Sequence, residues 1–146
     1  MDDAIRRVID GWRASGVPLQ AGLAPADIEV SFAKVGRQLS FDIVTLYSLC
    51  NGMPDAVSDN EHFFSLWSVE KCIREAPRFA RSFIPFADFL ISSHEYCFRF
   101  QSPERSSVHV SWNSVDGRNE QVAASVEEFF WLLANQPVKV YTLLRA

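Results

Sequence analysis

Three histidines are among the residues of this chain whose types could support catalysis. The run Ser93-His94-Glu95 joins a hydroxyl, an imidazole and a carboxylate, the kinds of group that a hydrolytic triad uses. Neighbouring residues of a strand point to opposite faces of a sheet, so we expect these three side chains to diverge. His109 alternates with apolar residues in another predicted strand, and we expect it to face solvent.

An acidic segment could bind a cation through Asp55, Asp59, Glu61 and His62. Its spacing matches neither an EF-hand loop nor the HExxH zinc motif. A solvated surface loop is therefore favoured over a metal site, and we expect the protein to use no cofactor. Because an acidic loop attracts a basic partner, these four residues also form a candidate partner-binding patch.

The three cysteines, Cys50, Cys72 and Cys97, lack the CxxC spacing of a zinc or redox site. A reactive thiol needs an electropositive, partly exposed setting. All three instead fall at inward positions of apolar patterns, which predicts core packing. The chain also contains neither a GxGxxG fingerprint nor a Walker loop for phosphate binding. We therefore expect no catalytic residues and no enzyme activity.

Length and composition favour one domain spanning residues 1–146 with a large aromatic core. Hydrophobic residues make up 48% of the chain, and its twelve phenylalanines and four tryptophans can bury much apolar surface. The net charge of −4 and the absence of a basic stripe argue against nucleic-acid binding. No leader or apolar run of membrane length is present, so we expect a cytoplasmic protein, monomeric or weakly dimeric.

Apolar residues recur at helical spacing in three N-terminal segments. They are Ile5, Val8, Ile9 and Trp12 in the first, Ile28, Phe32 and Val35 in the second, and Ile43, Leu46, Tyr47 and Cys50 in the third. Ser40 is a candidate N-cap for the third helix. We expect that helix to end near Asn51-Gly52, because Gly52 can adopt positive φ and Pro54 cannot continue a helix.

From residue 84 the apolar period changes from helical spacing to two. The stretches IPFADFLIS, YCFRF and VHVSW are predicted strands joined by turns, and HFFSLW is a shorter strand followed by a helix over VEKCIREA. Ser125 and Glu128 form a capping box at the start of a later helix. After Pro137 a final helix is favoured over a strand. The predicted fold is α+β, with N-terminal helices, a central, mostly antiparallel β-meander and C-terminal helices packed on one face.

Trp67 lies at the junction between the short strand and the following helix, close to the acidic segment. A tryptophan in such a place can be a core residue or an interface anchor. We favour the core, and we keep Trp67 as a candidate partner-binding residue together with the acidic patch.

The order of these segments resembles the SUKH superfamily, specifically its Smi/Knr-like branch. The matching stretches are GVPLQAGLAPADIEVSFAKVG, LSFDIVTLYSLCNGM, FFSLWSVE, FADFLISSHEYCFRF and VAASVEEFFWLL, which cover nearly the whole chain. The most specific are the segment Leu46–Gly52, Trp67 after the short strand, and Ser125–Phe129. FADFLISSHEY departs from the glycine- and aspartate-rich strand opening of many relatives, which puts any pocket built on that turn in doubt.

The resemblance implies an α+β domain that binds proteins and performs no catalysis. Many bacterial members resemble immunity proteins that neutralise a cognate polymorphic toxin by stoichiometric binding, so a basic toxin domain is the expected partner. The alternatives are a regulatory or scaffold module of the Smi/Knr type and a small-molecule-binding domain. The resemblance does not specify the partner, because contact residues diverge quickly in such families.

Overall fold

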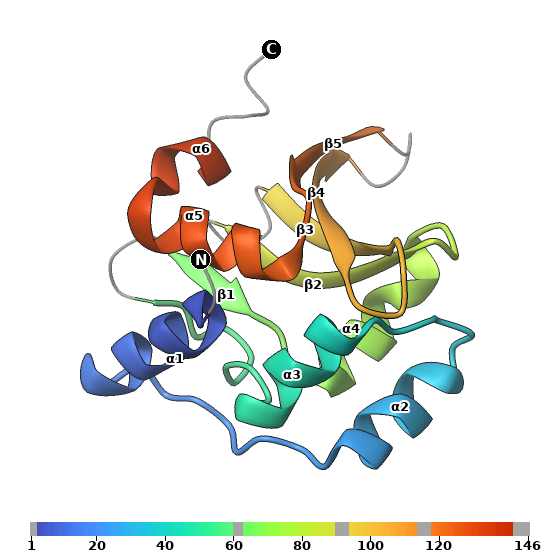
Figure 1. Cartoon of the computed structure of the whole chain (residues 1–146), viewed down its shortest axis with the longest axis horizontal. Coiled ribbons are helices and arrows are strands. Elements are labelled where there is room, and N and C mark those ends of the chain that lie inside the picture. The colour runs from blue at the N-terminus through green and yellow to red at the C-terminus, as the bar shows by residue number, and fades with distance from the viewer. Residues whose placement is uncertain (1–2, 60–62, 90–93, 114–117, 142–146) are drawn as a thin grey trace.

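Six α-helices, a short 3-10 helix and five strands form the described part of the chain, residues 3–59, 63–89, 94–113 and 118–141 of a computed structural model (Figure 1). In chain order they are α1 (Ala4–Ala14), α2 (Pro25–Ala33), α3 (Phe41–Leu49), β1 (Phe64–Leu66), α4 (Val69–Glu75), η1 (Ala76–Arg78), β2 (Phe83–Phe89), β3 (His94–Phe100), β4 (Ser106–Asn113), β5 (Arg118–Ala123), α5 (Val126–Asn135) and α6 (Pro137–Tyr141). The α+β class and the final helix are confirmed.

The five strands form one sheet in sequence order, β1-β2-β3-β4-β5. Every neighbouring pair is antiparallel, so the predicted meander is confirmed. A register shift between Pro85 and Ala87 marks a bulge in β2. At Pro85 the chain lacks the N–H that a regular ladder needs, and prolines within sheets are tolerated at such irregular positions.

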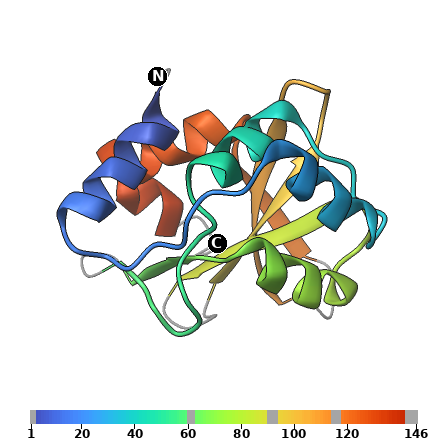
Figure 2. The same cartoon turned by 90° about the horizontal axis from the view of Figure 1, so that it is seen from below.

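The helices α1, α3 and α5 cover one face of the sheet (Figures 1 and 2). Aromatic side chains of these helices and of the strands belong to the core between them. The rings of Phe86 and Phe98 stack with centroids 3.8 Å apart, and Phe129 of α5 meets Phe86 edge-on at 5.6 Å. Tyr96 is fully buried and donates its hydroxyl to the Val140 carbonyl at 3.1 Å, which ties α6 to the sheet. The C-terminal helices thus complete the core from this face.

The opposite face of the sheet is also partly covered, which the alternating pattern did not predict. Cys97 points away from Tyr96 and Phe98, yet it is buried. Its thiol lies near Cys72 of α4 and Arg78 of η1. Figure 2 shows α4 across the sheet from α1 and α5. The sheet is therefore enclosed on both sides near β2 and β3.

The predicted cap at Ser125 has the expected geometry, and Ser68 caps α4 in the same way. The Ser68 hydroxyl accepts from the Lys71 N–H at 3.1 Å, and the Ser125 hydroxyl accepts from the Glu128 N–H at 3.0 Å. Glu128 reaches back one residue further than predicted, to the N–H of Ala124 at 2.8 Å. This bond pairs a backbone N–H just before the helix, so Ser125 and Glu128 together still cap the N-terminus of α5.

Ser40 sits at the N-cap position of α3 but makes no side-chain cap bond. Its hydroxyl instead donates to the Asp42 carboxylate and lies 2.6 Å from the Ser106 hydroxyl. The other Asp42 oxygen accepts from the N–H groups of Ser106, at 3.2 Å, and Val126, at 3.3 Å. One carboxylate therefore joins α3, β4 and α5. Burial is the main cause that raises the pKa of Asp42.

Helix α3 does end close to Asn51-Gly52, as predicted, but these two residues do not form its C-cap. Helix α3 ends at Leu49, and Cys50 is extended and forms a β-bridge with Ala21. Gly52 does have positive φ, 72°, but for a different reason. A Cβ on Gly52 would lie 2.5 Å from the backbone carbon and oxygen of Trp67, so only glycine allows this approach.

Asn51 binds the start of α4. Its side-chain oxygen accepts from the Val69 N–H at 2.8 Å, and its amide nitrogen donates to the Glu70 carboxylate at 2.9 Å. We name the region where Asn51-Gly52 meets Trp67-Ser68 the α3–α4 joint. Asn51-Gly52 thus connects two helices rather than ending one.

Candidate functional site

All three cysteines are buried, as predicted. Burial raises the pKa of Cys72 to about 12, and it also raises the pKa values of Cys50 and Cys97. Thiols with raised pKa values are protonated at neutral pH and are poor nucleophiles. The raised pKa values of the three thiols therefore agree with a role in core packing.

His109 contradicts its prediction, because it is buried rather than exposed to solvent. Its Nε2 lies 2.9 Å from the Ser107 hydroxyl, and its Nδ1 lies 3.0 Å from the Asn119 amide oxygen. The ring also meets Phe83 edge-on at 5.5 Å. Alternation correctly placed His109 on the face opposite the main core but could not show that this face is covered.

Two short contacts join a hydroxyl, an imidazole and an amide in the order of a Ser-His-Asn relay, through Ser107, His109 and Asn119. Two observations favour a structural role. Ser107 is 2% exposed, which keeps a substrate carbonyl away from its oxygen, and the same oxygen already accepts from the Gln101 amide at 2.8 Å. Burial lowers the pKa of His109, so the ring is held neutral as a hydrogen-bond bridge between β4 and β5.

His94 and Glu95 belong to the predicted Ser-His-Glu run, of which Ser93 lies outside the described residues. The His94 ring packs edge-on against Phe89 with centroids 5.4 Å apart. Glu95 pairs with Arg78 at 3.1 Å. The two side chains therefore engage different neighbours, and the structure does not bring them together as an acid–base pair.

Trp67 is 1% exposed and does not belong to a surface patch, so its assignment as a partner-binding residue is corrected. Its indole N–H donates to the buried Asp88 carboxylate at 2.6 Å. The Lys71 ammonium lies 4.7 Å from the centre of the ring. The favoured alternative, a core residue, is confirmed.

The predicted acidic patch is only partly at the surface. Asp59 is buried, and its carboxylate accepts from the Phe64 N–H at 3.1 Å, so its assignment as an exposed contact is also corrected. Asp55 is exposed and pairs with Arg74 at 3.5 Å and Lys71 at 4.0 Å. Glu61 and His62 lie outside the described residues.

Phe63 is the exposed aromatic residue of this connection, and sequence reasoning missed it. It is 56% exposed, although it was assigned to the short strand. Its φ is 58°, a conformation that costs a bulky side chain about 1–3 kcal/mol and is concentrated at functional sites. The bonds of Asp59 to Phe64 hold the chain on either side, since the Asp59 N–H also donates to the Phe64 carbonyl at 2.8 Å.

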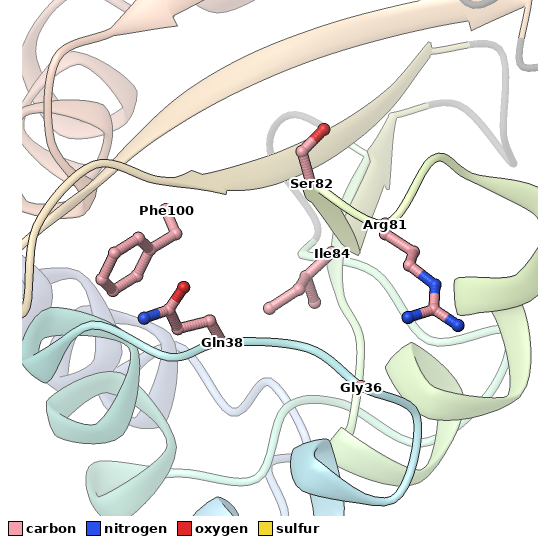
Figure 3. A pocket seen from close by; sticks show the side chains of 6 residues that line it. All are labelled: Gly36, Gln38, Arg81, Ser82, Ile84 and Phe100. Atoms are coloured by element: carbon pink, nitrogen blue, oxygen red, sulfur yellow. The ribbon is translucent and has the colours of Figure 1, made fainter.

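A small pocket of about 240 Å³ opens where the α2–α3 connection meets the start of β2 and the end of β3 (Figure 3). It is lined by Gly36, Gln38, Arg81, Ser82, Ile84 and Phe100. In Figure 3 the Arg81 guanidinium lies at one end, the Gln38 amide lies beside the Phe100 ring at the other, and Ile84 lies between them. Nothing in the local sequence pattern predicted this pocket, because its lining residues come from segments that are far apart in the chain.

Arg37 builds the frame of this pocket. Its guanidinium donates to the carbonyls of Val35 (3.0 Å), Phe83 (3.0 Å), Ala76 (2.7 Å) and Phe79 (3.2 Å). These bonds fasten the α2–α3 connection to η1 and β2. Burial, followed by the like charge of Arg81, lowers the pKa of Arg37.

No protein-family model matches this sequence, and no curated protein matches it. The resemblance to the SUKH superfamily therefore rests on the sequence motifs alone. Within the described residues, no three His, Cys, Asp or Glu side chains are grouped to hold a metal. None of the described helices combines the length and apolar character needed to cross a membrane.

Proposed function

We propose that this chain is a cytoplasmic, non-catalytic protein-binding domain of the immunity type, which neutralises a toxin by stoichiometric association. The observation that carries the proposal is the exposed Phe63 on a left-handed backbone. A strained conformation persists only where the surrounding structure holds it, and the Asp59–Phe64 hydrogen bonds do so. The SUKH-like motifs support the same kind of function.

Phe63 and Asp55 lie on the same connection between α3 and β1 and supply the two parts of a contact surface. Exposed aromatic residues are enriched among the residues that dominate binding energy. The Asp55 carboxylate is 66% exposed, and such peripheral charges mainly accelerate association with a basic partner. Phe63, and not Trp67, is therefore the aromatic anchor that we propose.

Co-expression with a candidate toxin domain, sought among the genes next to this one, tests the proposal directly. We expect this protein to restore growth and to form a one-to-one complex with the toxin. Equal killing with and without this protein would reject the immunity function. Consumption of a substrate by the purified domain would reject its non-catalytic character.

Variants of the two exposed phenylalanines test the surface itself. Phe63→Ser should weaken toxin binding by roughly 30-fold or more, the loss expected at an interface hot spot of about 2 kcal/mol. Phe41→Ser is the matched control, because Phe41 is 71% exposed and lies at the start of α3. Equal affinities of the two variants would show that Phe63 is not the anchor.

Charge steering is tested in the same way with two aspartates. Asp55→Ser should slow association and reduce its dependence on salt. Asp10→Ser, whose side chain is 65% exposed on α1, removes the same charge elsewhere. Association rates that fall equally in the two variants would point to net charge rather than to this surface.

A further inference from the structure

We propose that the pocket beside Arg81 binds a carboxylate attached to a short apolar chain. The carboxylate would pair with the Arg81 guanidinium, and the apolar chain would extend past the buried Ile84 to the half-buried Phe100 ring. This site lies on a different part of the fold from Phe63 and does not depend on the toxin-binding proposal.

The polar side chains of the pocket have no partners within the described residues. Neither Arg81 nor Gln38 makes a hydrogen bond or ion pair there through its side chain, and the same holds for Ser82. By contrast, Arg78 of the adjoining 3-10 helix is paired with both Glu75 and Glu95. Arg81 therefore presents a planar set of donors whose geometry matches a carboxylate.

The charge of the pocket favours an anion. Arg81 is close enough to the Arg37 guanidinium to lower the pKa of Arg37. Within the part of the chain that the structure describes, the hydrogen bonds of the Arg37 side chain go to neutral carbonyl groups, so they leave its charge uncompensated. A bound carboxylate would relieve the repulsion between the two cations as well as pair with Arg81.

The remaining surface of the pocket selects what the carboxylate is attached to. Ile84 lies between the two polar ends, and the Phe100 ring forms the far wall next to the Gln38 amide (Figure 3). Ile84 is 3% exposed and Phe100 is half-buried, so the Phe100 ring supplies the apolar surface that remains open. A hydrated inorganic anion would leave this ring in contact with water, whereas an alkyl or aryl chain would cover it. The volume of about 240 Å³ is below the roughly 300–1,000 Å³ of a drug-sized site, so the ligand is small.

Nuclear magnetic resonance titration of the whole chain with acetate, hexanoate and hexanamide tests the proposal. We expect hexanoate to shift the backbone amides of Gly36, Gln38 and Ser82 saturably, with at least tenfold higher affinity than acetate or hexanamide. Equal binding of hexanoate and hexanamide would remove the role of charge. A lack of saturable shifts would overturn the proposal.

Two arginine variants provide the matched control. Arg81→Gln should weaken hexanoate binding at least tenfold, whereas Arg6→Gln, an exposed arginine of α1 that does not line the pocket, should leave it unchanged. Arg81→Lys keeps the charge without the planar fork and should bind with intermediate affinity. Undiminished binding by Arg81→Gln would reject the site.

The carboxylate can belong to a free acid or to the C-terminus of a peptide. An apolar, N-acetylated tripeptide with a free C-terminus and the same peptide as its amide distinguish these sources. A peptide acid that binds at least tenfold more tightly than hexanoate, with loss in the amide, would assign a protein terminus. Hexanoate that binds as tightly as the peptide acid would assign a small free acid.

Discussion

Polar groups at the α3–α4 joint and in the pocket beside Arg81 have opposite surroundings. At the joint, both ends of the Asn51 amide are bonded, and the Trp67 indole donates to Asp88. In the pocket, the side chains of Gln38 and Arg81 have no such partners within the described residues.

The difference separates polar residues that hold the fold together from polar residues that are available to a ligand. A buried polar group is costly unless it is bonded, so the bonds at the joint are required for stability. An exposed polar group without an internal partner is solvated and contributes little to the folded state. Substitutions should therefore affect stability at the joint and binding at the pocket.

Gly52→Ala should have the largest effect on the joint. The substitution places a Cβ 2.5 Å from the Trp67 backbone at a φ of 72°. Left-handed strain of roughly 1–2 kcal/mol and overpacking of roughly 1–3 kcal/mol together predict a loss of about 2–5 kcal/mol. Urea denaturation measures this loss.

Gly16→Ala is the control for Gly52→Ala. Gly16 also has positive φ, 78°, but a Cβ there meets no atom within 4 Å. The Gly16→Ala substitution should therefore lower the free energy of unfolding only by the backbone strain, about 1–2 kcal/mol. If the two variants lose the same stability, the close approach of Gly52 to Trp67 is not important.

Trp67→Phe should have the next largest effect. The change removes the indole donor and leaves the Asp88 carboxylate buried without that bond, which predicts a loss of about 1–3 kcal/mol. In a double-mutant cycle, Trp67→Phe should cost less when Asp88 is already replaced by Leu. Strict additivity would show that the indole–carboxylate bond contributes nothing measurable.

The sequence predicted the fold far better than it predicted the surface. Helical spacing located the apolar stripe of α1, and alternation located the inward positions Tyr96 and Phe98, because burial of apolar side chains leaves a periodic trace. The pattern around Asn51-Gly52 suggested a helix end, whereas its actual constraint is the backbone of Trp67, fifteen positions away in the chain. Local patterns do not contain such contacts.

The candidate site was harder to predict for the same reason. Acidity and a nearby tryptophan suggested a contact patch, but Asp59 and Trp67 are buried by tertiary contacts. The exposure of Phe63 could not be predicted, because an exposed phenylalanine beside a strand looks the same in sequence as a buried one. The pocket at Arg81 joins three separate segments, so only the folded structure brings its residues together.

His109 should make a smaller, pH-dependent contribution to stability. Burial lowers the pKa of His109 in the folded state below its ordinary value of 6.5, so the unfolded chain takes up the proton first as pH falls. Its contribution is therefore complete above pH 6.5 and is lost as pH falls from 6.5 towards the folded pKa. Each unit of pKa difference corresponds to about 1.4 kcal/mol.

Denaturation at a series of pH values between 7 and 5 measures this slope. Burial also lowers the pKa of His94, so both rings contribute in the same direction. His109→Gln should reduce the slope, and His94→Gln should remove the part due to His94. If the slope is unchanged in His109→Gln, the ring is not held neutral by burial.

Gln38→Leu and Arg81→Leu should have the smallest effects on stability, within about 0.5 kcal/mol of the native protein. Both side chains lack internal polar partners within the described residues, so the substitutions break no hydrogen bond of the folded protein. Removing Arg81 also removes a cation that opposes the charge of Arg37, and the stability should rise slightly as a result. The urea midpoints and the hexanoate affinities of the two variants together show whether these side chains affect stability or binding. A large loss of stability would place the pocket in the same category as the joint, whereas weaker hexanoate binding without that loss would keep the two regions distinct.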